Sequence, residues 1–175
     1  MEKAHKICVE MLNQREYKII TDEDDKIVAT KPDGKNMIVF FSGISKFNVK
    51  NMQVFITVMN DLDIFHAIII YKDGITAFTK KAIDQSIEMK FELFAEEDLQ
   101  YNITKHALQP EFNKITVTEA EHLKTNYGSK FPILRHDDPI TRFYNFQKND
   151  VIKIIRKSGY ISYRIVKWIL QMLFI

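Results

Sequence analysis

The segment from Phe131 to Lys167 constrains the fold more than any other part of the chain, because it combines one helix start with two strand patterns. Asp138 stands directly before a proline, so its carboxylate can accept hydrogen bonds from the free amides of a helix whose first residue has a suitable fixed φ. A short helix is therefore expected over Pro139–Tyr144. The runs Val151–Arg156 and Tyr160–Val166 are rich in β-branched residues and predict the two strands of a hairpin.

The connections in this segment are typical of turns. Asn145 and Asn149 stand where the chain must change direction, and asparagine is the non-glycine residue that best tolerates a positive φ. The stretch Lys157-Ser158-Gly159 is short enough to close the hairpin tightly. The sequence therefore predicts one small module in which a helix precedes a β-hairpin.

This part of the chain is also basic. From Lys130 to Lys167 there are nine Lys or Arg residues and three acids, a net charge of +6, whereas the remainder of the chain carries −4. A basic face favours nucleic-acid phosphates or an acidic protein surface. Charge alone does not separate these two partners from each other or from a solvated surface.

Motifs over most of the chain, from about Met37 to Lys167, resemble one known family. They are, in chain order, Phe65–Ile70, Asn102–His106, Pro110-Glu111, Asp138-Pro139, Arg142–Tyr144, Val151–Arg156, Ser158 and Tyr163–Val166. In their order and nearly in their spacing they resemble the fifth-largest subunit shared by eukaryotic RNA polymerases I, II and III, a family that has a counterpart in the archaeal polymerase. The resemblance implies a noncatalytic subunit of a multisubunit DNA-directed RNA polymerase.

The resemblance also implies an α+β chain in two parts. An N-terminal α/β jaw, with a sheet and helices similar to restriction endonucleases, is expected over residues 1–106, and a small C-terminal α+β assembly domain over 117–167. Residues 107–116 lack periodicity and are expected to be a linker. A capping box of Thr118 and Glu121 predicts the start of the next helix. The apolar stretch 168–175 extends beyond the usual end of the family and is too short to span a bilayer.

Apolar periodicity predicts the elements of the first part. Helices are expected over 4–14, 48–59 and 76–85, and strands over 26–30, 36–41, 65–71 and 89–93. The run 65–71 is continuously apolar, which is typical of a strand covered on both faces in the middle of a sheet. Strand, helix and strand in that order predict a small α/β sheet.

In the family the C-terminal domain docks on the largest polymerase subunit, and the jaw lies beside downstream DNA. The expected docking residues are Asp138, Pro139, Arg142, Tyr144, Lys153, Arg156, Tyr163 and Arg164. Arg142 and Arg156 can form bidentate pairs with carboxylates, and the tyrosines add rigid contact area. The alternatives are that Asp138-Pro139 is only a helix cap and that Tyr144 and Tyr163 belong to the core.

The residues expected near DNA follow the buried strand. They are Lys72, Thr76, Lys80 and Lys81. Lysines there would touch phosphates without reading bases, so contact would be weak, nonspecific and sensitive to salt. The alternative is that they only solvate a helix.

Two other functions compete with a polymerase subunit. One is a metal-dependent nuclease, in which two carboxylates hold magnesium and a lysine assists the attacking water. The residues that resemble this pattern are Asp33, Glu88 and Lys90. A simpler interpretation is that Asp33 is a solvated acid in a turn and that Glu88 and Lys90 lie at the edge of an alternating strand. The third hypothesis is a free DNA-binding regulator that never joins a polymerase.

The residue types do not predict a cofactor or a small-molecule substrate. Five histidines lie far apart, the single cysteine cannot build a zinc knuckle, and no glycine-rich loop is arranged to cradle phosphates. Neither secretion nor a membrane role is expected. A cellular polymerase subunit would be nuclear, whereas a large-DNA-virus version would lie in a cytoplasmic virus factory or in the virion.

Overall fold

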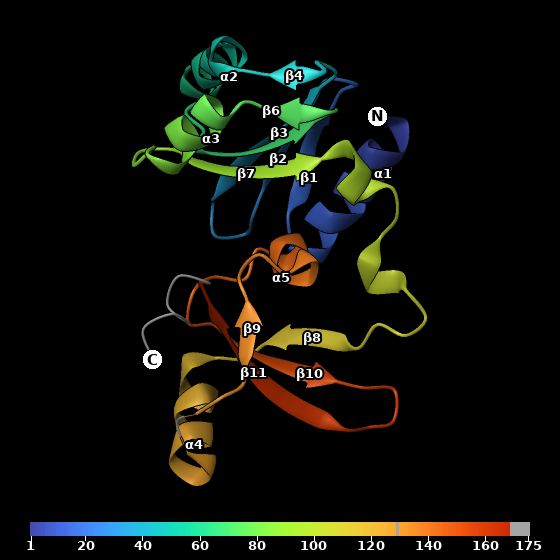
Figure 1. The fold of residues 1–175 in the computed structure, drawn as a ribbon, viewed down its shortest axis with the longest axis vertical. Coiled ribbons are helices and arrows are strands. Elements are labelled where there is room, and N and C mark those ends of the chain that lie inside the picture. Colours follow the sequence, from blue (N-terminus) through green and yellow to red (C-terminus); the bar gives the residue numbers. More distant parts are fainter. Residues whose placement is uncertain (129, 169–175) are drawn as a thin grey trace. The chain divides into compact units, whose positions relative to one another are not determined.

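The computed structural model of the chain describes residues 1–128 and 130–168 (Figure 1). The chain folds into two compact units, Met1–Asn102 and Ile103–Ile175. Each unit combines helices with a sheet of its own, which confirms the mixed α+β class expected from the sequence. The expected domain boundaries remain a prediction.

The first unit is built on a five-stranded sheet with the order β1-β2-β3-β5-β7. The strands are β1 (Lys18–Asp22), β2 (Lys26–Thr30), β3 (Asn36–Ser42), β5 (His66–Tyr71) and β7 (Lys90–Ala95). The first three form an antiparallel meander, and β3, β5 and β7 are parallel. Strand β5 has a partner on each side and four consecutive buried residues, as its continuous apolar run predicted.

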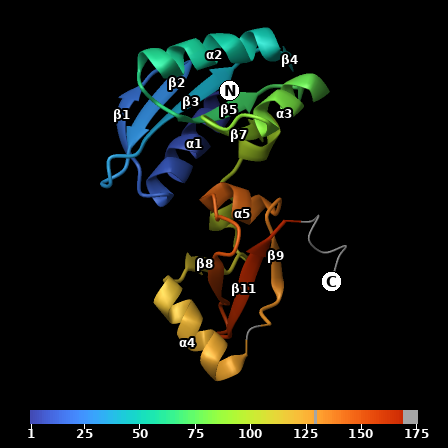
Figure 2. The same ribbon diagram turned by 90° about the vertical axis from the view of Figure 1, so that its left-hand side faces the viewer.

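Helices cover both faces of this sheet. They are α1 (Glu2–Gln14), α2 (Val49–Asp61) and α3 (Ala77–Asp84), with a short 3₁₀ helix η1 (Glu96–Leu99) after β7. Figures 1 and 2 show α2 and α3 on one face and α1 on the other. Met52 and Met59 of α2 pack with Ile38 and Ile69 of the sheet, and the short strands β4 (Lys46–Phe47) and β6 (Gly74–Ile75) pair beside this core.

The second unit contains a four-stranded sheet with the order β8-β10-β11-β9. Its elements are η2 (Ile103–Lys105), β8 (Glu111–Lys114), α4 (Val117–Tyr127), β9 (Ile133–Arg135), α5 (Pro139–Tyr144), β10 (Val151–Ile155) and β11 (Ile161–Lys167). The expected hairpin of β10 and β11 is confirmed, as is the short helix α5. Asn145 and Asn149 have φ of 54° and 70°, so both asparagine turns are confirmed as well.

Part of the expected linker is a strand. Residues 111–114 form β8, which pairs antiparallel with β10 and places Phe112 against the core of the second unit. The strand is short, and Phe112 is its one apolar side chain, so it carries no alternating pattern that would reveal it. The chain thus joins the second sheet before the point where the sequence predicted the domain to begin.

The expected capping box at Thr118 and Glu121 is wrong by two residues. Thr116 is the N-cap of α4, and its Oγ1 accepts a hydrogen bond from the Glu119 amide over 3.2 Å. The Glu119 carboxylate accepts from the Thr116 amide over 2.9 Å, which completes the box. Both threonines have a glutamate three positions later, so the sequence pattern did not distinguish them.

Replacing Thr116 with alanine is expected to lower the free energy of unfolding of the second unit by about 1 kcal/mol, because the first turn of α4 loses its cap. Denaturant unfolding followed by the fluorescence of Trp168, the single tryptophan, measures this change. Thr118→Ala is the matched control and should leave stability nearly unchanged. Equal losses in the two variants would contradict the assignment of Thr116 as the cap.

The described part of the chain contains no helix long and apolar enough to cross a membrane. The predicted apolar tail 168–175 lies outside the described residues except for Trp168. The indole ring of Trp168 stacks on the imidazole of His136 with their centroids 3.8 Å apart.

Candidate protein-binding site

The expected docking residues begin at the N-terminus of α5. The Asp138 carboxylate accepts a hydrogen bond from the Ile140 amide over 2.9 Å, and Pro139 occupies the first helical turn. Asn145 ends the helix in the left-handed conformation. The cap predicted at Asp138 is therefore present, and it fixes the direction in which this short helix leaves β9.

Helix α5 buries one side and leaves the other half-exposed. Ile140 and Phe143 are buried, whereas Arg142 is half-buried. Tyr144 lies between these extremes, because its ring stacks on Phe146 at 5.2 Å and packs against the core of the second unit. Burial raises the pKa of the Tyr144 phenol, and a hydrogen bond with Thr104 opposes that rise. Tyr144 therefore belongs partly to the core.

The register of the hairpin divides the sheet residues between two faces. Lys153 lies opposite Tyr163, and Arg164 lies opposite the buried Ile152. Because successive side chains of a strand point to opposite faces, Arg164 shares the face of Ile152 and Phe146, whereas Lys153 and Tyr163 lie on the other face. Arg164 Nη1 also donates to the Ile133 carbonyl over 3.4 Å, which ties β11 to β9.

The charge of Lys153 acts on an acid of α4. Hydrogen bonds from the Thr116 amide and hydroxyl lower the pKa of the Glu119 carboxyl in α4, and the charge of Lys153 lowers it further. Lys153 therefore already has an acidic neighbour within its own unit.

Arg156 lies apart from the α5 residues. It is exposed in the hairpin turn, where its amide donates to the Tyr160 carbonyl over 2.9 Å. The turn is at one end of β10, a strand about 16 Å long, and the segment from α5 enters at the other end. The structure thus brings Asp138, Pro139, Arg142 and Tyr144 together but does not join them with Arg156 in one patch.

Sequence reasoning overlooked the residues directly before α5. Arg135 donates from Nε and Nη2 to the Asp137 carboxylate over 2.9 and 2.7 Å. This pair raises the pKa of Arg135 and lowers the pKa of Asp137. The available signal was a basic residue followed within three positions by two acids in the stretch Arg135–Asp138, and it places a bidentate ion pair beside the candidate docking helix.

The residues expected near DNA lie on and before α3. Thr76 is the N-cap of this helix, and its Oγ1 accepts from the Thr79 amide over 3.3 Å. Lys72, Lys80 and Lys81 are exposed. Phe78 of the same helix is 72% exposed, an unusual state for a phenylalanine. The helix therefore presents cations and one aromatic ring to solvent.

The residues of the nuclease hypothesis do not form a carboxylate pair. Asp33 lies in the exposed turn between β2 and β3, where Lys35 Nζ donates to its carboxylate over 2.7 Å. Lys90 begins β7, which is separated from β3 by β5 in the sheet, and Glu88 is exposed just before that strand. Within residues 1–128 and 130–168, no three His, Cys, Asp or Glu side chains are grouped so that they could hold a metal ion.

A polar network inside the first unit was not expected from the sequence. Arg15 donates from Nη1 and Nη2 to the Glu92 carboxylate over 3.2 and 2.8 Å, and His66 Nε2 lies 2.7 Å from Glu92 Oε1. The Arg15 side chain is 2% exposed and that of Glu92 is 11% exposed. Burial raises the pKa of Glu92, but Arg15 and His66 outweigh it and hold that pKa at about 2. The network therefore links α1, β5 and β7 through charged groups.

Comparisons with known proteins agree on one family. The family model described as RNA polymerase Rpb5, C-terminal domain, matches residues 101–166. A protein of Invertebrate iridescent virus 6 that carries the name DNA-directed RNA polymerase subunit 454R is 35% identical over 94% of this chain and 98% of its own length. The subunit rpabc1 of RNA polymerases I, II and III from Dictyostelium discoideum is 30% identical over 93% of this chain and 95% of its own length.

A third relative, RPABC1 of Caenorhabditis elegans, is 29% identical over 94% of each chain. These similarities run through both units and are not limited to the segment that contains α5 and the hairpin. They confirm the family resemblance inferred from the motifs. The chain therefore belongs to the family of the RNA polymerase subunit Rpb5.

Proposed function

We propose that this protein is a noncatalytic subunit of a multisubunit DNA-directed RNA polymerase. The observation that carries the proposal is the similarity to polymerase subunits over nearly the whole length of both chains. A shared end-to-end relationship supports a shared role better than a match of one domain does. The role we propose is positional: the protein connects a jaw near downstream DNA to the largest subunit.

The second unit is the proposed attachment to the largest subunit. Arg142 and Arg156 supply guanidinium groups that can bind partner carboxylates with two hydrogen bonds each. Tyr163 and the half-buried Tyr144 add amphipathic area of the kind that anchors interfaces. Asp138 and Pro139 act indirectly, because they hold α5 in place. Lys153 and Arg164 lie on opposite faces of the sheet, so the proposed attachment uses more than one surface of this unit.

The first unit is the proposed jaw. Its mixed sheet with helices on both faces is consistent with the restriction-endonuclease-like architecture implied by the family. Lys72, Lys80 and Lys81 would contact phosphates of downstream DNA without reading bases, with Thr76 capping the helix that carries two of them. The corresponding location is the nucleus for a cellular protein, and a virus factory or virion for a viral one.

Affinity purification of a tagged copy from the cells or virus that produce it tests the proposed function. We expect the largest subunit and other polymerase subunits to be recovered in a fixed ratio to the tagged chain. Recovery of the chain alone would contradict the proposal. Magnesium-dependent DNA cleavage by the purified chain that disappears in Lys90→Ala would also contradict it, because the protein would then be an enzyme in its own right.

A further inference from the structure

Two helices of the first unit begin side by side at one small ribbon. Strands β4 and β6 pair in parallel, with Phe47 opposite Ile75. The residue after each strand caps a helix, Asn48 for α2 and Thr76 for α3, and the Thr76 amide donates to the Phe47 carbonyl over 3.1 Å. The starts of α2 and α3 are therefore neighbours, although they lie far apart in the sequence (Figure 1).

Lysines gather around these two helix starts. The stretches 45–51 and 72–81 contain five lysines and one acid, a net charge of +4. The acid, Asp73, accepts a hydrogen bond from Ser45 Oγ over 2.7 Å. Among the residues that the structure describes, none of the five ammonium groups forms an ion pair. All five side chains are exposed, and we name them the lysine patch: Lys46, Lys50, Lys72, Lys80 and Lys81.

The ring of Phe78 stands among these charges. Phe78 is the second residue of α3 and Lys50 is the second residue of α2, so the paired strands bring the two to corresponding positions. Lys81 follows Phe78 by three residues and therefore lies on the same side of α3. The Phe78 side chain is 72% exposed. The surface thus offers a ligand cations and one flat apolar ring.

A nucleic acid fits this surface better than an acidic protein does. Protein interfaces are enriched in arginine and depleted of lysine, whereas residues 42–81 contain lysines and no arginine. A lysine ammonium is a point charge that binds phosphate without a fixed orientation. The exposed ring further favours an unpaired base, because each base in a duplex already has its faces covered by the neighbouring bases.

We propose that the lysine patch and Phe78 bind single-stranded nucleic acid. One unpaired base stacks on the Phe78 ring, and the lysines hold the neighbouring phosphates. Every base has a flat face, so this site tolerates any sequence. The inference rests on the proposed function, which brings the first unit close to nucleic acid, and it adds Lys46, Lys50 and Phe78 to the residues expected there from the sequence.

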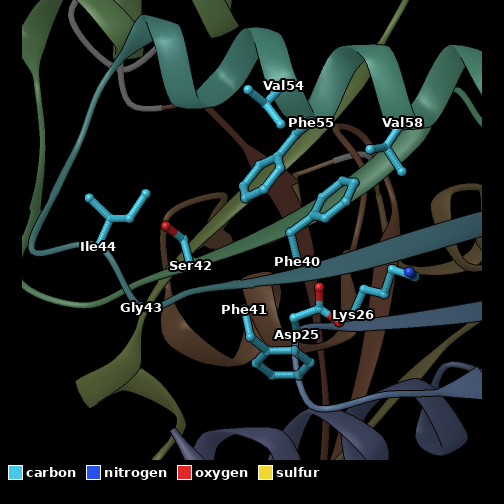
Figure 3. A pocket seen from close by; sticks show the side chains of 10 residues that line it. All are labelled: Asp25, Lys26, Phe40, Phe41, Ser42, Gly43, Ile44, Val54, Phe55 and Val58. Carbon is cyan, nitrogen blue, oxygen red and sulfur yellow. The ribbon is translucent and has the colours of Figure 1, made fainter.

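An apolar hollow of about 330 Å³ between α2 and β3 is a separate feature. Figure 3 shows Val54 and Phe55 of α2 facing Phe40 and Ser42 of β3 across it. Neither Phe78 nor any residue of the lysine patch lines this hollow. The proposed stacking site is therefore the exposed ring itself and not a cavity.

Fluorescence anisotropy of labelled probes tests the role of the ring in the full chain. The probes are an oligothymidylate and an oligouridylate of about 15 nucleotides, a duplex of similar length, and an oligoglutamate peptide as a polyanion without bases. We expect Phe78→Ala to weaken binding of the single strands about fivefold to 150-fold, the equivalent of about 1–3 kcal/mol for one stacked base. Binding of the duplex and of oligoglutamate should change less than about twofold, because those ligands meet only the lysines.

Two variants control for the loss of an exposed apolar side chain. Ile87→Ala should leave all affinities unchanged, because Ile87 is 97% exposed but follows the other end of α3. Phe78→Trp keeps a stacking ring and should retain the affinity for single strands.

Two double variants test the charges. Lys46→Ala with Lys81→Ala removes two phosphate contacts, so the dependence of log affinity on log salt concentration should become less steep by about 1.4 for a single strand. Lys3→Ala with Lys6→Ala removes two exposed lysines from α1, on the opposite face of the sheet, and should leave this dependence unchanged. Equal effects of the two double variants would contradict the assignment of the lysine patch.

The probes separate the competing ligands. Equal losses for the single strands and the duplex in Phe78→Ala, or no loss for either, would overturn the proposal. Oligoglutamate bound as tightly as oligothymidylate would assign the surface to an acidic protein and would also overturn it. A preference between oligouridylate and oligothymidylate tells whether RNA or an unpaired DNA strand is the ligand, and either preference supports the proposal.

These outcomes are distinguishable from failure of the proposed function. A tagged Phe78→Ala chain should recover the largest polymerase subunit in the natural ratio, because the proposed attachment lies in the second unit. Recovery of polymerase by a natural chain that binds no single strand would reject this inference alone. Binding of single strands by a natural chain that recovers no polymerase would reject the proposed function alone.

Discussion

Replacing Glu92 with glutamine is expected to lower the free energy of unfolding of the first unit by about 3–5 kcal/mol. The side chain keeps its shape but loses its charge, which removes the carboxylate that Arg15 contacts through two hydrogen bonds at a site where the Arg15 side chain is 2% exposed. His66 also loses the carboxylate that it contacts over 2.7 Å. Hydrogen exchange of the amides in β5 and β7 measures the loss, because these central strands report opening of this unit.

The control for Glu92→Gln removes both charges together. A double variant, Arg15→Met with Glu92→Met, should be more stable than Glu92→Gln alone, because a buried ion pair can often be replaced by apolar groups with little loss. Asp33→Asn, which breaks the exposed contact with Lys35, should leave exchange unchanged. A loss from Glu92→Gln no larger than that from Asp33→Asn would show that the network does not stabilise the fold.

The same network predicts how the first unit responds to acid. The pKa of Glu92 is lowered from 4.5 to about 2, so its contribution is fully present above pH 4.5 and is lost as the pH falls through about 2. A shift of this size corresponds to about 3 kcal/mol. Exchange measured at decreasing pH, corrected for the intrinsic rate, should show this loss in the natural chain, and the dependence should be weaker in Glu92→Gln.

The double charge reversal Arg142→Glu with Arg156→Glu is expected to abolish co-purification with the largest polymerase subunit. Each guanidinium that is replaced by a carboxylate turns a proposed attraction into repulsion, and truncating one member of a buried charge pair already weakens an interface by about 2–5 kcal/mol. Quantitative mass spectrometry of the tagged complex measures the ratio of the two chains. The fluorescence of Trp168 on denaturation checks that the second unit remains folded.

A matched control carries the same change in charge at other exposed residues of this unit. Lys148→Glu with Lys157→Glu should leave the ratio of the chains nearly unchanged, because neither lysine belongs to the proposed surface. Arg142 lies on α5 and Arg156 lies in the hairpin turn after β10, so each single reversal should give a partial loss and the two losses should add. Undiminished recovery of the double variant would refute the interface assignment.

Local signals predicted a large part of this fold. Three local patterns each favour one conformation strongly. They are the Asp138-Pro139 pair, the two asparagines at positive φ and the continuous apolar run of β5. In these places the propensity of a few neighbouring residues agrees with the tertiary structure, and the prediction is confirmed. The mixed α+β class followed from the same signals.

The short strands and the placement of side chains on the sheet faces could not be predicted from local sequence signals. Strands β8 and β9 contain four and three residues, too few for an alternating pattern, and they exist because β10 and β11 offer them partners. The choice between Thr116 and Thr118 depended on where α4 begins, because each threonine has a glutamate three positions later. Alternation within β11 alone separates Tyr163 from Arg164, whereas the placement of Lys153 on the face of Tyr163 required the register between the two strands.

The strand orders of the two sheets have a consequence for synthesis on the ribosome. The first sheet is complete once Ala95 has been translated, so that unit can begin to fold while the rest of the chain is still being made. In the second sheet the two interior strands, β10 and β11, come last, and both edge strands precede them. Nascent β8 therefore stays unpaired until β10 has emerged, and β9 stays unpaired until β11 has emerged as far as Lys167, so unpaired strand edges are exposed until late in translation.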